Sequence, residues 1–215
     1  AHTNASTLGL VNSTGVNTVN IAGSTSAFTL TGVGNAVDIT LSDSAVSHTI
    51  EFNDVTGSAD AIDLTVAQIT GGAATDVTIA GVESINLVSA GGNNSNDFEL
   101  IATDLETLTV TGSGAITLPS LHTATTRSIS KLDFSGFSGG ANVTTGALTI
   151  GLTDLTVVGG AGNDTFDSSA FVSADASVDG GAGNDTITHD IAITDTLVGG
   201  DGSDTLSTST RITEA

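Results

Sequence analysis

The sequence predicts an all-β protein: a right-handed parallel β-helix, or β-solenoid, that ends in a β-roll at its C-terminal end. Three observations predict this fold. A pattern repeats about every 22 residues, each repeat holds two short strand-like segments, and the composition is rich in Thr, Val, Ser and Gly, which favours strands over helices. One repeat cannot bury its apolar side chains alone, so stacked coils form one continuous core. A β-sandwich, which also has short strands at regular spacing, is the competing architecture.

The first set of strands is marked by two apolar residues that alternate with polar ones. Alternation with a period of two places both apolar side chains on one face of a strand. The steps between the first members of successive pairs are 20, 23, 23, 23, 24, 23 and 21 residues. The pairs fall at 19–21, 39–41, 62–64, 85–87, 108–110, 132–134, 155–157 and 176–178, and Leu197 continues the series.

The second set of strands lies between members of the first. Its apolar positions are 28–30, 50–52, 77–79, 98–100, 116–118 and 148–150, then the single residues Phe166, Ile187 and Leu206. We divide the chain into a degenerate β-solenoid over residues 1–150 and a β-roll over residues 151–215. The first ~60 residues are the least regular, and a sandwich-like cap is an alternative for them.

Composition narrows the classes of partner. The 215 residues include 24 Asp and Glu but only three Lys and Arg, which gives a formal net charge of −21. We therefore expect no nucleic-acid partner, because phosphate binding needs basic side chains. No apolar stretch approaches the ~20 residues of a membrane span, so we expect no direct membrane insertion. The acidic excess either keeps an exported protein soluble or awaits a hard divalent cation.

A glycine-rich nonapeptide occurs three times near the C-terminus. The copies are GGAGNDTFD at 159–167, GGAGNDTIT at 180–188 and GGDGSDTLS at 199–207. All fit G-G-x-G-x-D-x-U-x, where U is a large apolar residue, which is the pattern of calcium-binding β-helix repeats. The glycines permit a tight turn and bring backbone carbonyls close to an ion. The sixth residue supplies the carboxylate, and Ca²⁺ takes six to eight such oxygens.

The spacing places the three loops on one edge of the stack. Steps of 21 and 19 residues correspond to one 18-residue coil plus a small insertion. We expect one calcium ion between 159–164 and 180–185, and another between 180–185 and 199–204; empty glycine turns in a dry β-helix are the alternative. The predicted metal-site residues are Gly159, Gly160, Ala161, Gly162, Asn163, Asp164, Asp179, Gly180, Gly181, Ala182, Gly183, Asn184, Asp185, Gly199, Gly200, Asp201, Gly202 and Asp204, with Asp76 and Asp97 added from degenerate copies at 71–76 and 91–97.

The nonapeptides resemble the RTX repeats of proteins exported by bacterial type I secretion systems. The Thr- and Ser-rich coils at 82–92 and 105–118 look like those of RTX-type surface-layer (S-layer) proteins of Gram-negative bacteria. This resemblance implies a secreted structural protein at the bacterial cell surface that folds on meeting calcium. It also implies self-association into a lattice, with any binding to outer-membrane surface polysaccharide made through another region.

Two other functions remain open from the sequence. An RTX adhesin module would bind a surface or glycan through Thr-rich flat faces, and a C-terminal RTX domain could belong to a secreted protease or lipase. The only enzyme-like motif is G-x-S-x-G around Ser138, and it lacks the strand-to-helix elbow that such a nucleophile needs. We therefore predict no catalytic residue and no enzyme activity. The four histidines, His2, His48, His122 and His189, are predicted to be loop residues.

Overall fold

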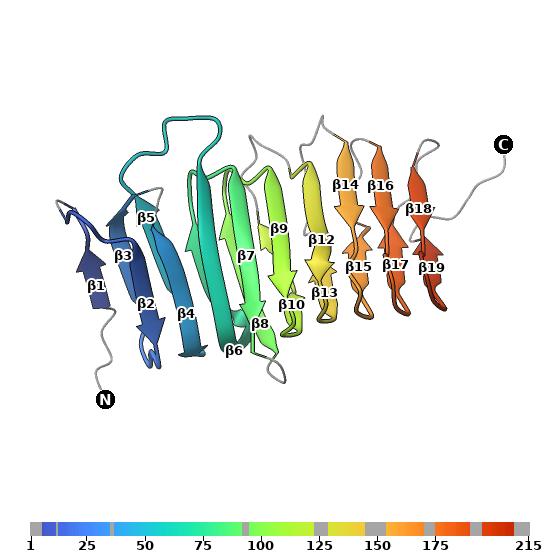
Figure 1. Cartoon of the computed structure of the whole chain (residues 1–215), viewed down its shortest axis with the longest axis horizontal. Helices are drawn as coiled ribbons and strands as arrows, with labels where there is room; N and C mark the ends of the chain where they lie inside the picture. The colour runs from blue at the N-terminus through green and yellow to red at the C-terminus, as the bar shows by residue number, and fades with distance from the viewer. Residues whose placement is uncertain are drawn as a thin grey trace.

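The chain forms an elongated stack of short parallel strands (Figure 1). The computed structural model describes residues 6–11, 13–34, 37–91, 95–122, 129–144, 154–169, 175–189 and 195–208. Every regular element within these ranges is a β-strand. No helix in the described ranges is long and apolar enough to cross a membrane. The all-β, parallel β-solenoid prediction is confirmed, and the arrangement is consistent with the right-handed β-helix.

One long ladder, here called sheet B, carries the first set of predicted strands. Each strand pairs in parallel with the strand one coil later. Its members in spatial order are β2 (Thr18–Ala22), β4 (Asp38–Ser44), the first part of β6 (Ala61–Ile79), β7 (Ser84–Ala90), β9 (Thr107–Gly112), β12 (Lys131–Phe137), β14 (Leu155–Val158), β16 (Ala176–Asp179) and β18 (Thr196–Val198).

The second ladder, sheet A, faces the first across the core. Its pairings are also all parallel. Its members are β1 (Ser6–Gly9), β3 (Phe28–Val33), β5 (His48–Phe52), the last part of β6, β8 (Asn96–Ala102), β10 (Ile116–Leu118), β11 (Leu121–His122), β13 (Ala141–Thr144), β15 (Thr165–Ser168), β17 (Thr186–His189) and β19 (Thr205–Thr208). The predicted segment at 148–150 lies outside the described residues.

The ladders run through both of the places where the sequence suggested a change of structure. Strands β1 to β5 pair in parallel with their neighbours and join β6, so the described part of the first ~60 residues continues the solenoid and does not form a sandwich-like cap. The pairings of β12 with β14 and of β13 with β15 likewise cross residue 150. Parallel pairing persists because the same inward apolar columns continue from coil to coil.

The core lies between the two sheets and consists of those columns. Inward residues such as Leu64, Leu87, Leu108 and Leu132 are essentially inaccessible to solvent. Towards the C-terminal coils the core becomes aromatic. The ring centroid of Phe134 lies 6.1 Å from that of Phe137 and 5.4 Å from that of Phe166. This cluster supports the coil that carries the first glycine-rich nonapeptide.

The last described coil keeps the register but not the burial. Leu206 lies opposite Ile187 in the ladder, as its predicted role as a core residue requires. Its side chain is nevertheless 49% exposed, because the described residues include no coil stacked beyond it. Burial at the eighth position of the nonapeptide therefore depends on the neighbouring coil as well as on the residue.

Candidate metal centre

The three glycine-rich turns stack on one edge of the solenoid, as the spacing predicts. Loop 1 (residues 159–164), loop 2 (180–185) and loop 3 (199–204) each connect a sheet B strand to the next sheet A strand. The backbone amide of Ala182 donates to the carbonyl oxygen of Gly160 at 2.9 Å, and the amide of Asp201 donates to that of Gly181 at 2.8 Å. Equivalent positions of successive loops are therefore hydrogen-bonded to one another.

The third glycine of loops 2 and 3 is required by backbone geometry. Gly183 and Gly202 have φ angles of +131° and +140°, which residues with a side chain rarely adopt. A Cβ atom on Gly183 would also overlap the carbonyl oxygen of Gly162, and one on Gly202 would overlap that of Gly183. In each case the carbonyl oxygen of one loop occupies the space that a side chain at the third glycine of the next loop would need.

The sixth residue of each loop points its carboxylate along the stack. Oδ1 of Asp164 accepts from the amide of Ala141 at 2.9 Å, Oδ1 of Asp185 from that of Asp164 at 2.8 Å, and Oδ1 of Asp204 from that of Asp185 at 3.0 Å. Each carboxylate thus contacts the preceding coil. Three like charges stand in adjacent rungs, about 4.8 Å apart along a parallel ladder.

The second carboxylate oxygen, Oδ2, is hydrogen-bonded in Asp164 but, within the described part of the chain, not in Asp185. Oδ2 of Asp164 accepts from the amide of Gly160 at 3.0 Å, so that carboxylate is paired on both sides. Oδ2 of Asp185 is buried and has no hydrogen-bond partner among the described residues. A buried carboxylate oxygen without a donor costs free energy, and a cation would remove that cost.

Burial and like charge raise the pKa of both buried carboxyls. For Asp164, burial raises the pKa most, the amides of Ala141 and Gly160 oppose it, and the charge of Asp185 adds to it. For Asp185, burial again raises the pKa most, and the charges of Asp204 and Asp179 add to it. Burial, helped by neighbouring like charges, therefore disfavours the ionised form of both carboxyls.

The other predicted loop residues form the wall of the same edge. Oδ1 of Asn163 accepts from the amide of Asn184 at 2.8 Å, and Oδ1 of Asn184 accepts from that of Ser203 at 2.9 Å, so the exposed asparagines tie the loops together. Asp179 ends β16, and its Oδ1 accepts from the amide of Gly181 at 3.0 Å. Ala182 forms a parallel β-bridge with Asp201, and the amide of Ala161 donates to the carbonyl oxygen of Phe137 at 2.9 Å.

The degenerate copies add no carboxylate to this column. Asp76 and Asp97 lie on the outward side of sheet A, both partly exposed. The inward residue in the second copy is Asn96, which pairs through Ile116 with Ala141, next to Asp164 in the ladder. Oδ1 of Asn96 accepts from the amide of Ile69 at 3.0 Å, and its Nδ2 donates to Oγ of Ser89 at 2.8 Å. The neutral amide of Asn96 can both accept and donate, whereas a carboxylate at this position could not donate to Ser89.

The donor set of loops 2 and 3 fits calcium. The described residues contain no group of three His, Asp or Glu side chains placed to hold a metal. An ion would therefore depend on backbone carbonyls together with Asp185 and Asp204, which is the mixture of hard oxygens that calcium accepts. A Cβ on Gly180 would fall against both the carbonyl oxygen of Gly199 and Oδ2 of Asp185, so two oxygens converge on a place that glycine keeps open.

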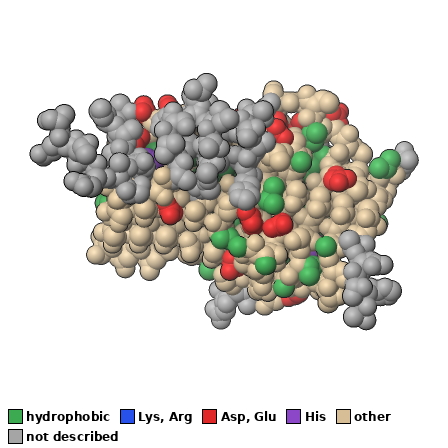
Figure 2. Space-filling view, turned by 180° about the vertical axis from the view of Figure 1, so that it is seen from behind, with side chains coloured by type: hydrophobic (Ala, Val, Ile, Leu, Met, Phe, Trp, Pro, Cys, Tyr) green, Lys and Arg blue, Asp and Glu red, His purple; other side chains and the backbone are tan. Residues whose placement is uncertain are grey.

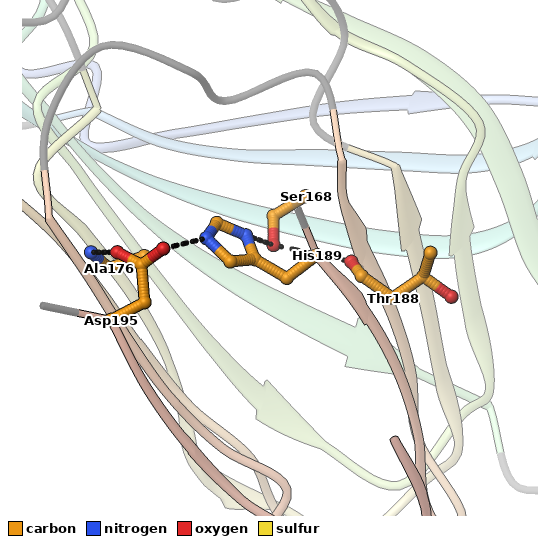
Figure 3. Close-up of polar contacts among 5 residues, drawn as sticks. All are labelled: Ser168, Ala176, Thr188, His189 and Asp195. Carbon is orange, nitrogen blue, oxygen red and sulfur yellow. Dashed lines mark hydrogen bonds and ion pairs between the residues drawn. The ribbon is translucent and has the colours of Figure 1, made fainter. Parts of the chain in front are cut away.

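A buried polar chain on the opposite edge was missed by the sequence reading (Figure 3). Oγ of Ser168 lies 2.8 Å from Nδ1 of His189, and Nε2 of His189 lies 3.1 Å from Oδ2 of Asp195. Oδ1 of Asp195 accepts from the amide of Ala176 at 2.7 Å. All three side chains are about 1% exposed, and their contacts link neighbouring coils.

Two of the predicted loop histidines are therefore core residues. His189 belongs to β17 and His48 to β5, where Nε2 of His48 lies 2.8 Å from Oγ of Ser44. Burial lowers the pKa of His48. His122 lies in β11, and His2 lies outside the described residues. No local pattern marks these contacts, because Ser168 lies one coil before His189, and Ser44, although only four residues before His48, lies in a strand of the other sheet.

Fold and site together define a parallel β-solenoid with a stacked column of glycine-cradled carboxylates on one edge. A scan against protein-family models finds no match. A search of curated proteins likewise finds no significant match.

The buried carboxyls predict that calcium-free protein is more stable at acidic pH. Because their folded-state pKa values lie above the ordinary 3.8, the folded state binds protons more tightly than the unfolded state. Their protonation therefore stabilises the fold below pH 3.8, and this stability is lost as the pH rises through the raised values.

We expect the melting temperature of calcium-stripped protein to fall between about pH 4 and about pH 7, and to fall less in Asp185→Asn. The pKa of Asp133, lowered to about 2 mainly by Lys131, acts in the opposite direction and only below pH 3.8. Thermal melts by circular dichroism at several pH values test this. A melting temperature that rises over this range, equally in both proteins, would show that the two carboxyls do not control the pH dependence.

Proposed function

We propose that this chain is a calcium-dependent structural segment of a secreted bacterial surface-layer protein, which self-assembles into a lattice on the cell surface. Calcium bound between stacked loops offsets the repulsion of the carboxylate column and lets the C-terminal coils close. In this proposal the segment has no enzyme activity. Type I secretion delivers it, and binding to outer-membrane surface polysaccharide falls to another region of the protein.

The observation that carries the calcium part is the buried, unpartnered Oδ2 of Asp185. It lies beside the carbonyl oxygen of Gly199, between two further loop carboxylates and on a chain with a net charge of −21. Without a cation, the column holds adjacent like charges in a partly dehydrated place, which is unfavourable. A divalent cation is the simplest partner that removes this cost.

One surface feature supports self-association. Acidic side chains lie at several places on the face drawn in Figure 2, so close packing of neighbours would favour bridging cations.

Calcium is expected to raise the thermal stability of the whole chain. At a calcium concentration a hundred times the dissociation constant, one site adds about 2.7 kcal/mol, which corresponds to about 5–10 °C in the melting temperature of a domain this size. Differential scanning calorimetry in calcium, in magnesium and in chelator measures this. An identical midpoint in all three would remove the basis of the proposal.

An adhesin module that binds a surface or glycan is the second candidate. The observation in its favour is a column of outward threonines on sheet A, where Thr165, Thr186 and Thr205 stand in register on β15, β17 and β19. Electron microscopy of the calcium-loaded protein separates the two functions. Ordered two-dimensional arrays support the surface-layer role, whereas saturable glycan binding by a monomer that forms no arrays supports the adhesin.

A further inference from the structure

We infer that the loops form one calcium site and not two: it lies between loop 2 and loop 3 with Asp185 at its centre, while Asp164 caps the column against the preceding coil. This inference rests on the proposed function. It replaces the expectation of one ion between each pair of successive loops with a single ion between loops 2 and 3. It also gives chemically similar aspartates different roles.

The first step is the pairing of the carboxylates. Both oxygens of Asp164 accept backbone amides, from Ala141 in the preceding coil and from Gly160 in its own loop. An ion at Asp164 would have to displace at least one of these charge-assisted hydrogen bonds. Asp185 keeps one such bond, from Asp164, and leaves a buried oxygen free for a cation.

The second step is the backbone of the loops. Gly181 and Gly183 of loop 2 have φ angles of +92° and +131°, and Gly200 and Gly202 of loop 3 have +98° and +140°. The matching glycines of loop 1 lie outside this left-handed region. Loops 2 and 3 therefore share a glycine backbone geometry that loop 1 lacks.

The third step is the distribution of acids. The ladder aligns Val158, Asp179 and Val198, so only loop 2 is preceded by a carboxylate. Asp179 accepts the amide of Gly181, and the corresponding amide in loop 1, that of Gly160, pairs with Asp164. Asp201, bridged to Ala182, adds a further acid between loops 2 and 3. The corresponding residue of loop 1 is Ala161. Charge thus concentrates between loops 2 and 3, and calcium affinity rises with the charge of its ligands.

The preceding coil explains why Asp164 is a cap. Ala161 donates to the carbonyl oxygen of Phe137, as Ala182 does to that of Gly160, so the coil around Phe137 stacks beneath loop 1. The residue in line with Asp164 in that coil is Ala141, which offers an amide but no carboxylate. The side chain of Asp164 satisfies that amide, and the carboxylate column ends there.

The test compares two isosteric substitutions in the full chain, Asp164→Asn and Asp185→Asn, by isothermal titration with calcium. We expect one tight ion per wild-type chain, a dissociation constant within about threefold in Asp164→Asn, and a weakening on the order of a hundredfold in Asp185→Asn. Circular dichroism checks that each variant is folded. As a second measurement, calcium should shift the NMR amide signals of Gly181 and Gly200 of the wild-type protein more than that of Gly160.

The possible results separate the two proposals. Two tight ions per chain, or equal loss of affinity in both variants, would overturn the single-site inference while leaving the calcium-dependent function standing. The same holds if the amide of Gly160 shifts as much as those of Gly181 and Gly200. No binding and no amide shift in the wild-type protein would instead refute the proposed function.

Discussion

Replacing Gly183 by Ala is expected to lower the free energy of unfolding by about 2–5 kcal/mol, as the sum of backbone strain and overpacking. The glycine has a φ of +131°, and a methyl group there would overlap the carbonyl oxygen of Gly162 and come 3.1 Å from Oδ1 of Asn163. Neither neighbour can yield easily, because the carbonyl belongs to the stacked backbone. Calcium affinity should fall with stability, since the loop that carries Asp185 must move.

Urea denaturation in calcium measures this loss, and Gly34→Ala is the matched control. Gly34 lies outside the left-handed φ region, and nothing stands within 4 Å of the position its Cβ would take. That substitution should change stability by no more than about 0.5 kcal/mol. Equal effects of the two substitutions would show that the stacked loop conformation is not what glycine is needed for.

Replacing Phe134 by Ala is expected to cost about 3–5 kcal/mol, the usual range for a fully buried phenylalanine. Its side chain is inaccessible to solvent and packs against Phe137 and Phe166. Because Phe166 follows Asp164 by two residues, the cavity would lie beneath loop 1. In a solenoid each coil is stabilised mainly by its neighbours, so the loss should spread to the loops stacked above.

Two further variants give the comparison for Phe134. Leucine at this position keeps most of the apolar contact and should cost only about 1–2 kcal/mol. Val88→Ala removes an outward side chain that is 38% exposed and should be nearly neutral. Urea titrations followed by circular dichroism rank the three. A Phe134→Ala protein as stable as Val88→Ala would place the core of these coils elsewhere.

Strand positions could be predicted because burial in a solenoid repeats at the level of single residues. Ile85 and Leu87 alternate with polar neighbours, and both are buried in β7. The same alternation locates β9 around Leu108 and Val110. Such a pattern is local, so it can be read without knowing which strands pair.

Asp76 and Asp97 were predicted as metal ligands from degenerate copies of the motif, but residue type alone does not determine which residue of such a copy faces the core. Asp97 has the right residue type, yet the alternation of β8 buries Asn96 and Phe98 on either side of it, so Asn96 takes the inward position. Two glycines at 139–140 also resemble the start of the motif, but the carbonyl oxygen of Gly139 stands against the third glycine of loop 1, Gly162.

The buried histidine chain had no sequence signal at all. Ser168, His189 and Asp195 come from different coils or turns, and their spacing of 21 and 6 residues follows no ligand or triad pattern. Only the stacking of β15 on β17 brings the hydroxyl to the imidazole. Sequence reasoning assigned His189 to a loop because a lone polar residue carries no information about its partners.

The sequence by itself determined the repeat, the alternation of apolar residues and the edge on which three aspartates stand, because each of these follows from local periodicity. Tertiary structure alone decided which carboxylate oxygen is left without a donor. Asp164 and Asp185 occupy identical hexapeptides, yet both oxygens of Asp164 accept amides, from Ala141 and Gly160. Among the described residues, only one oxygen of Asp185 does so, from the amide of Asp164. The difference arises from the coil above or below, which lies about twenty residues away in the chain and one rung away in space.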